Sequence, residues 1–344
     1  MKGQKGLKSL RITALGALLF AGLAAVASAQ STFEPHPVAA GTLRIWGDAS
    51  MSSVVLRWEE RFYRYHPEVK FETRLMGTDT AMPGLYTGVA DIALFGRESN
   101  QTEDDGFLHT LQYKPLQLRL MTGSLDAPGK SYALVLFVHK DNPLEKLTLA
   151  QIDLIFGCGQ PGQSAPARTW GDLGLGGEWK DKPIRLYTFD TESGSGLFLQ
   201  HKLQGESRKL NWPVIQEFSD ARRTDGTSYE VGEQTMDGLL HDSYGLAVSS
   251  LRYANGSVKA IALAATSGSA YVQASRETLI DGTYPLTRMT YAFVNQPPGQ
   301  LVSPLAKEFL RFVYSEEGQG MIEESHGFLP LTKEAAAKQI LLLQ

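Results

Sequence analysis

Strands that alternate with helices across polar turns constrain the fold of this chain most strongly. Residues 41–47 (GTLRIWG) are predicted to form a strand, and apolar residues at helical spacing follow over 51–65, until Pro67 stops the helix. A second strand at 69–75, a polar turn and a further helix lead to a buried strand at 91–96. Such alternation predicts an α/β fold in which mostly parallel sheets are covered by helices.

Polar turns follow the predicted strands, and they lie at the positions where an α/β fold binds its ligands. In open α/β sheets ligands bind beyond the carboxyl ends of the strands, where the turns that hold Ser50 and Thr78 would lie. A third turn lies in Tyr187–Leu203 (YTFDTESGSGLFLQHKL), where a strand gives way to an acidic turn, Ser-Gly-Ser-Gly and a helix. Backbone N–H groups and hydroxyls at a helix start form an anion site, so Ser195 is predicted to contact an anion.

Two other interpretations of Ser195 stay open. A serine nucleophile would need a neighbouring base, and the sequence lacks the G-x-S-x-G elbow of serine hydrolases. His201, six residues on, would lie about 240° around the helix from Ser195 and would not reach it. Ser195 could also be a plain helix cap, since serine is favoured at that position in any protein.

The first 29 residues have the pattern of a signal peptide. Four basic residues precede an apolar segment at about 12–26, and Ala27-Ser28-Ala29 is a small-residue cleavage site. We therefore predict an exported protein. A retained membrane anchor is the alternative, but the apolar segment is short for the roughly 20 residues that a span needs.

Charge and composition limit the partners. The chain has 33 basic and 37 acidic residues, and the signal peptide contains four basic and no acidic ones, so the mature chain carries a net charge of −8. A nucleic-acid surface would normally be basic, so we predict no nucleic-acid partner. Cys158 is the lone cysteine and the seven histidines show no paired spacing, so we predict no disulfide, no metal and no cofactor.

The rest of the chain continues the alternation with two irregular stretches. Strands are predicted at 132–138, 184–189, 244–248 and 290–294, most of them followed by helical patterns. The Gly- and Pro-rich stretch 157–177 is predicted to be a long loop. The polar stretch 219–232 is predicted to be a mobile loop.

Seven segments in one order resemble the PstS-like phosphate-binding proteins of bacterial ABC importers, which are type II periplasmic binding proteins. These segments are GDASM, GTDT, ADIALFGRE, YALVLFVHKDNPLEKLTLAQIDLIFGCG with TWGDLG, SGSG, YPLTRMTYAFV and SEEGQGMIEESHGFLPL. They span nearly the whole mature chain.

The resemblance implies a two-lobed α/β fold, in which each lobe is a mixed, mainly parallel sheet flanked by helices. The chain would cross between lobes near Tyr132–Phe137 and return near Tyr284–Arg288. The expected division is a signal peptide at 1–29, a discontinuous lobe I at 30–133 and 287–344, and lobe II at 134–286.

The resemblance also implies a ligand site between the lobes. Its expected contacts are listed here: Ser50 and the Met51 backbone, Thr78, and the turn of Gly194, Ser195 and Gly196. Three positions depart from the family: its Arg falls at Thr191, a Thr at Leu197, and the Asp that accepts a proton from phosphate near Gly96. We expect Arg97, beside Gly96, to supply the missing positive charge.

The resulting functional prediction is an exported, periplasmic solute-binding protein and not an enzyme. It would capture phosphate or a similar oxyanion as a monomer and deliver it to the transmembrane subunits of an ABC permease. One alternative, prompted by the missing Arg, is a sensor or binding protein of the same fold for a ligand other than phosphate. A remote alternative is an exported serine hydrolase.

Overall fold

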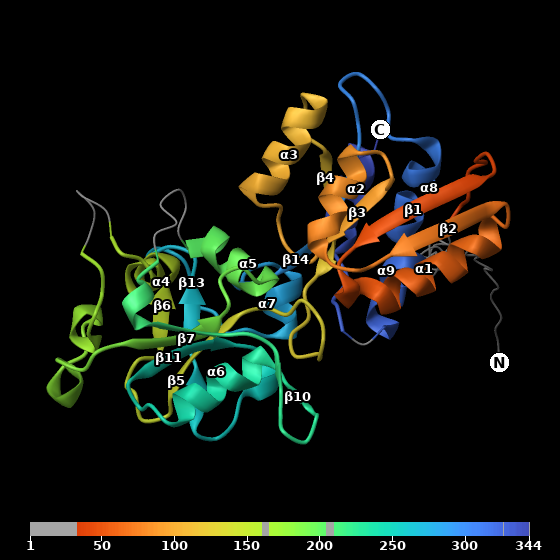
Figure 1. Ribbon diagram of the computed structural model, residues 1–344. Coiled ribbons are helices and arrows are strands. Elements are labelled where there is room, and N and C mark those ends of the chain that lie inside the picture. Colours follow the sequence, from red (N-terminus) through yellow and green to blue (C-terminus); the bar gives the residue numbers. More distant parts are fainter. Residues whose placement is uncertain (1–32, 160–164, 204–209, 326, 344) are drawn as a thin grey trace, which may run out of the picture.

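A computed structural model of the protein describes residues 33–159, 165–203, 210–325 and 327–343. Over these ranges the strands form two five-stranded sheets and two small two-stranded ones, and helices flank the large sheets (Figure 1). The predicted signal peptide lies outside the described residues. Along the described ranges, no helix is both long and apolar enough to cross a membrane.

The first sheet has the strand order β2-β1-β3-β14-β4. Its strands are β1 (Gly41–Gly47), β2 (Val69–Arg74), β3 (Ile92–Phe95), β4 (Leu116–Thr122) and β14 (Met289–Val294). β1 pairs in parallel with β2 and β3, whereas β14 pairs antiparallel with β3 and β4. A strand from late in the chain therefore completes a sheet that the early strands begin.

Helices cover both faces of this sheet, because β3 is apolar on both. They are α1 (Ser52–Tyr65), α2 (Ala81–Tyr86), α3 (Gln101–Leu111), α8 (Pro304–Val313), α9 (Glu316–Glu324) and α10 (Lys333–Leu342). Ile92 and Leu94 belong to the core that contains residues of α1 and α8, while Ala93 and Phe95 pack in a second cluster with Phe107 of α3. Burial on both faces explains why β3 lacks the polar alternation of a half-exposed strand.

The second sheet has the strand order β12-β5-β11-β7-β8. Its strands are β5 (Val135–His139), β7 (Arg185–Phe189), β8 (Ile215–Phe218), β11 (Gly245–Ser249) and β12 (Val258–Ala260). The helices that accompany this sheet are α4 (Leu149–Phe156), α5 (Gly194–Leu203), α6 (Val231–Leu240) and α7 (Arg276–Ile280). We call the first sheet with its helices the first half of the molecule, and the second sheet with its helices the second half. A two-stranded sheet of β6 (Lys146–Thr148) and β13 (Ala262–Ala264) lies beside it.

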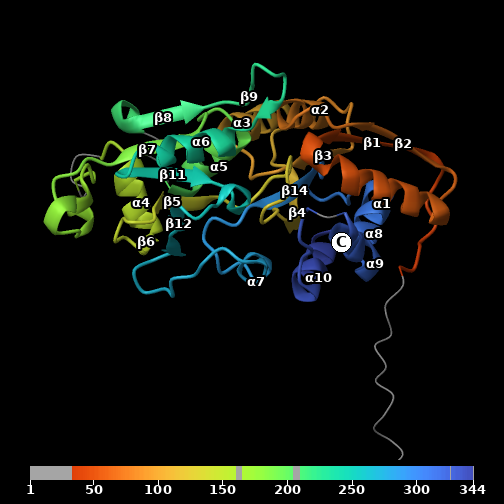
Figure 2. The same ribbon diagram turned by 90° about the horizontal axis from the view of Figure 1, so that it is seen from below.

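The chain passes between the two sheets twice, and the two passages lie side by side (Figure 2). Leu134 N donates to Leu286 O at 3.2 Å, Gly123 N donates to Arg288 O at 2.7 Å, and the Tyr284 hydroxyl donates to Leu134 O at 2.9 Å. The core of the second half is built from residues between 133 and 286 together with Leu329, and that of the first half from the segments on either side. We therefore propose that 30–133 with 287–344, and 134–286, are the two lobes.

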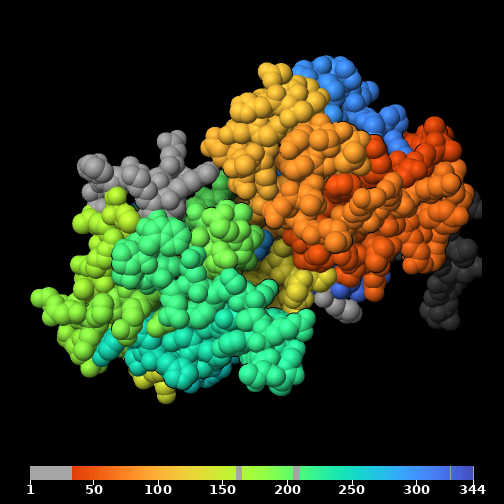
Figure 3. Space-filling model, viewed as in Figure 1, coloured from red at the N-terminus to blue at the C-terminus, as the bar shows by residue number. Residues whose placement is uncertain are grey.

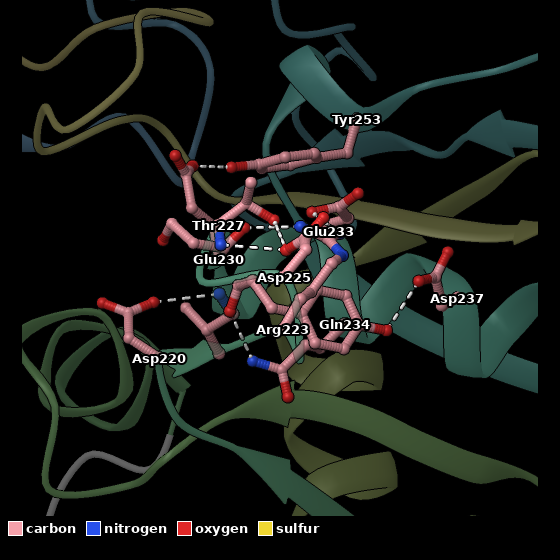
Figure 4. A network of polar contacts seen from close by, with 12 residues as sticks. Asp220, Arg223, Asp225, Thr227, Glu230, Glu233, Gln234, Asp237 and Tyr253 are labelled. Atoms are coloured by element: carbon pink, nitrogen blue, oxygen red, sulfur yellow. Dashed lines mark hydrogen bonds and ion pairs between the residues drawn. The ribbon is translucent and has the colours of Figure 1, made fainter.

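Two details differ from the sequence prediction. Each large sheet has two parallel and two antiparallel pairings, because strands reached by the passages run opposite to their neighbours. The stretch 219–232, predicted as a loop, contains a hairpin of β9 (Ala221–Arg222) and β10 (Ser228–Tyr229). Figure 4 shows the polar network that fastens this hairpin to α6, in which Arg223 lies 2.6 Å from Glu233 and Tyr229 donates to Asp237 at 2.6 Å.

The buried face of α1 yields a test of the first core. Trp58 is 1% exposed and its indole N–H donates to Gly318 O at 2.8 Å, whereas Leu56 on the same helix is 59% exposed. We expect Trp58→Ala to lower the free energy of unfolding by about 3–5 kcal/mol, because it leaves a large cavity. Leu56→Ala should change it by less than about 0.5 kcal/mol. Urea unfolding followed by far-UV circular dichroism measures both, and equal effects would contradict this packing.

Candidate functional site

A cleft of about 420 Å³ lies between the two halves. In the space-filling view the halves meet along a groove, with yellow residues of the first passage visible at its base (Figure 3). The side chains and backbone that line it are those of Asp48, Ser50, Gly129, Lys130, Ser131, Tyr132, Phe189, Ser193, Gly194, Ser195, Asp220, Ser228, Glu230, Val231 and Arg288. The lining thus joins turns at strand ends from both sheets with residues of both passages.

The start of α5 presents Ser195 to this cleft. The neighbouring Ser193 does the local capping, since its hydroxyl donates to Asp190 O at 2.6 Å and accepts from Gly196 N at 3.1 Å. Gly196 is required here, because a Cβ at this position would lie 2.2 Å from Asp190 O. Because Ser193 caps the turn, the Ser195 hydroxyl is left to face the cleft, which disfavours the interpretation of Ser195 as a plain cap.

Arg288 is the cation beside Ser195. Its Nη1 donates to Ser195 Oγ at 2.8 Å, and its Nε and Nη2 donate to Gly96 O at 3.1 and 2.7 Å. The guanidinium lies 5.4 Å from the centre of the Phe198 ring, and the residue is 4% exposed. Burial lowers the pKa of Arg288 to about 10, while the carboxylate of Asp48 opposes that shift. The side chain therefore keeps its charge at neutral pH.

Opposite α5, the turn after β1 supplies a carboxylate and hydroxyls. Asp48 Oδ1 accepts from Ser50 N at 2.8 Å, and Asp48 Oδ2 lies 3.4 Å from the Ser131 hydroxyl. A Cβ on Gly96 would lie 2.2 Å from both Asp48 Oδ2 and Ser131 Oγ. The Asp48 carboxylate therefore fills the space next to Gly96, the position near which the family resemblance implies an acid that this sequence lacks.

Lys130 adds a second cation at the edge of the cleft. Its ammonium donates to Ser50 O at 2.7 Å and to Ser53 Oγ at 2.8 Å, which fixes the turn that carries Ser50. Burial lowers the pKa of Lys130, and the nearby Asp48 carboxylate opposes this. The Lys130 ammonium also lies 5.4 Å from the centre of the Phe328 ring.

The structure brings together some of the predicted site residues. Ser50, Gly194 and Ser195 line the cleft. The Met51 side chain is buried in the core and its backbone N–H donates to Asp48 O at 3.2 Å, while Gly196 N is taken by Ser193. Thr78, at the start of the short 3₁₀ helix η2 (Thr78–Thr80), lies outside the cleft lining.

Arg97, expected to supply the positive charge, lies away from the cleft in an ion pair. Arg97 is 3% exposed, its Nη1 and Nη2 each lie 2.8 Å from a Glu103 carboxylate oxygen, and Nη1 also donates to Glu98 O at 2.9 Å. These contacts hold the Arg97 guanidinium against Glu103 and Glu98, and Arg97 is not part of the cleft lining, whereas Arg288 is. The buried cation that lines the cleft is Arg288, which sequence reasoning missed, and we propose that it takes the role expected of Arg97.

The close approach at Gly96 gives a test of this geometry. We expect Gly96→Ala to lower the free energy of unfolding by about 1–3 kcal/mol, because the new methyl group overlaps Asp48 Oδ2 and Ser131 Oγ. Gly256→Ala is the control, since a Cβ there meets nothing within 4 Å. Thermal unfolding of both variants measures the difference. A Gly96→Ala protein as stable as the control would show that Asp48 does not occupy this space.

Comparisons with known proteins agree on one family. Residues 33–317 match the family model described as the PBP superfamily domain. The chain is 31% identical over 343 residues to a phosphate-binding protein PstS of Pseudomonas aeruginosa, covering 99% of this chain and 98% of the relative. An ABC-type phosphate transport receptor from Vibrio cholerae superposes with a TM-score of 0.57 at 19% identity, covering 84% of this chain and 100% of that one. PstS from Borrelia burgdorferi does so with a TM-score of 0.57 at 15% identity, covering 85% and 99%.

Proposed function

The chain belongs to the PBP superfamily, among the PstS-type phosphate-binding proteins, and we propose that it captures phosphate or a similar oxyanion in the cleft between its two halves. Members of this family are solute-binding proteins. The groups that we assign to the anion are the side chains of Ser195, Arg288 and Ser50 and the backbone N–H groups of Gly194 and Ser195 at the start of α5, with Asp48 as an acceptor.

The observation that carries the proposal is the contact of Arg288 with Ser195 at the start of α5. The first N–H groups of a helix have no partner within the helix and attract negative charge. A guanidinium and a hydroxyl beside these N–H groups provide several donors that converge on one place. Such convergence replaces the water that a dehydrated oxyanion loses.

Asp48 gives the site a means to recognise a protonated oxyanion. The carboxylate already accepts from Ser50 N through Oδ1. Among the described residues, Oδ2 makes only the long 3.4 Å contact with the Ser131 hydroxyl. An ionised carboxylate can accept a hydrogen bond from a protonated oxygen of phosphate, but it repels an oxyanion that carries no proton. We therefore assign to Asp48 the acceptor role that the family places near Gly96.

Export and delivery follow from the family and from the predicted signal peptide. We propose that the mature protein works in the periplasm and passes its ligand to the transmembrane subunits of an ABC permease, without catalysing a reaction. A hydrolase would need a base beside Ser195, but the described partner of its hydroxyl is Arg288, which is protonated at neutral pH. The alternative of a different ligand was prompted by a missing cation, and Arg288 supplies that cation.

Removing either donor should weaken phosphate binding, and removing the charged donor should weaken it more than removing the neutral one. We expect Arg288→Met to raise the phosphate Kd by at least about 30-fold, as for the loss of one partner of a buried charged contact. Ser195→Ala, which leaves Arg288 in place, should raise the Kd by about tenfold or more, since it removes one hydrogen bond to a charged ligand. Isothermal titration calorimetry with phosphate measures both.

Controls separate these effects from general damage. Arg74→Met removes an arginine whose side chain is 57% exposed, and Ser267→Ala removes an exposed hydroxyl, so neither should change the Kd. Circular dichroism should show each variant folded. If Ser195→Ala binds phosphate as tightly as the unaltered protein, Ser195 is not a ligand contact.

Asp48 should control the choice between phosphate and sulfate. Sulfate carries no proton at neutral pH, so the Asp48 carboxylate can accept nothing from it. We expect Asp48→Asn to lower the ratio of the sulfate Kd to the phosphate Kd by about tenfold or more. The substitution removes the repulsion of sulfate and also removes the charged acceptor for the protonated oxygen of phosphate. Competition titrations with the two anions measure this ratio, and an unchanged ratio would exclude Asp48 as the acceptor.

A further inference from the structure

One face of α5 contacts the first half of the molecule along its whole length. Ser195, Phe198 and Lys202 are spaced by three and four residues and therefore lie on one face of the helix. Ser195 and Phe198 contact Arg288, and Lys202 Nζ lies 3.0 Å from Glu98 Oε1. Figures 1 and 2 show α5 beside β14, at the edge of the second half. The helix that offers Ser195 to the ligand is thus tied to the opposite half at both ends.

Glu98 is held in place by contacts from both halves. Its Oε1 also accepts from the Tyr291 hydroxyl at 3.2 Å, its side chain is 18% exposed, and its Oε2 is buried and has no hydrogen-bond partner among the described residues. Burial raises the pKa of Glu98, but the charge of Lys202 and hydrogen bonds outweigh it and lower the pKa overall. A largely buried carboxylate that is incompletely hydrogen-bonded is a poor source of stability, which makes the geometry that Glu98 fixes the more relevant property.

Side-chain packing does not fill the interface between α5 and the first half. A cavity of about 50 Å³ lies between residues 97–100 and the helix residues Leu197, Phe198, Gln200 and His201. A space of this size holds a water molecule or two and leaves part of the interface unfilled. The Lys202–Glu98 ion pair therefore restrains the helix where side-chain packing does not.

We propose that Lys202 and Glu98 are positioning residues that set the affinity of the cleft for its oxyanion. This inference rests on the proposed function. Lys202 lies two helical turns, about 10 Å, from Ser195. A rigid helix fixed at Lys202 cannot tilt away from Glu98, so the Ser195 hydroxyl and the first N–H groups stay aligned with Arg288. Without the ion pair, the ligand itself must bring these donors together, at a cost to its affinity.

Charge variants of the folded protein test the proposal. We expect Lys202→Met and Glu98→Gln each to raise the phosphate Kd by about threefold to thirtyfold, the range of coupling between contacting residues. Exchanging the charges, in the double variant Glu98→Lys with Lys202→Glu, should restore part of the affinity. Arg276→Met is the matched control. Arg276 also forms an ion pair across the halves, with Glu323, but that pair is exposed and lies away from α5.

Distances between the halves provide a readout that does not depend on a ligand. Spin labels on cysteines that replace Thr102 of α3 and Lys259 of β12, in a protein with Cys158→Ser, report the separation of the two halves. In the ligand-free protein we expect Lys202→Met to broaden the distance distribution and Arg276→Met to leave it unchanged.

The possible results distinguish a failure of the positioning role from a failure of the proposed function. A Lys202→Met protein with an unchanged Kd and an unchanged distance distribution would overturn the positioning role. So would equal weakening by Arg276→Met, or a charge-exchanged protein that binds no better than the single variants. If the unaltered protein binds no oxyanion at all, the proposed function fails, and the distance measurement still decides whether the ion pair restrains α5.

Discussion

The buried guanidinium of Arg288 is the constraint on which the arrangement of the site depends. A charged group that is 4% exposed must find hydrogen-bond partners, because unpaired burial is costly. Arg288 finds them in Gly96 O of the first half and in Ser195 Oγ of the second. The residue comes directly before β14, so the strand that completes the first sheet also brings the cation to the point where the halves meet.

Around this cation the cleft combines groups that suit an oxyanion. Hydroxyls and a helix start provide neutral donors, which bind negative charge without the need to bury a second counter-ion. In the proposed site, Asp48 takes the place of the acid that the family resemblance puts near Gly96. The lack of a side chain at Gly96 makes room for the carboxylate of Asp48, which reaches the cleft from the turn after β1.

The sequence predicted local structure well and long-range contacts poorly. Strand and helix patterns placed β1, α1, β7 and α5. Ser50 and Ser195, predicted because each lies in a turn at a strand end, both line the cleft. Arg288 was missed because it is 93 residues from Ser195 and no local pattern links them. The ion pair of Arg97 has a local signal in the sequence: Asn100 and Glu103 form a capping box that places the Glu103 carboxylate beside it. Asp225-Gly226 likewise signals the hairpin that we predicted as a loop.

A crystal structure of the protein grown with phosphate tests the central claim most directly. The account predicts one tetrahedral anion in the cleft, within hydrogen-bond distance of Arg288, the Ser195 hydroxyl and the N–H groups of Gly194 and Ser195, with Asp48 facing a protonated oxygen. An anion bound at Arg97, or a cleft that stays without an anion at saturating phosphate, would contradict it.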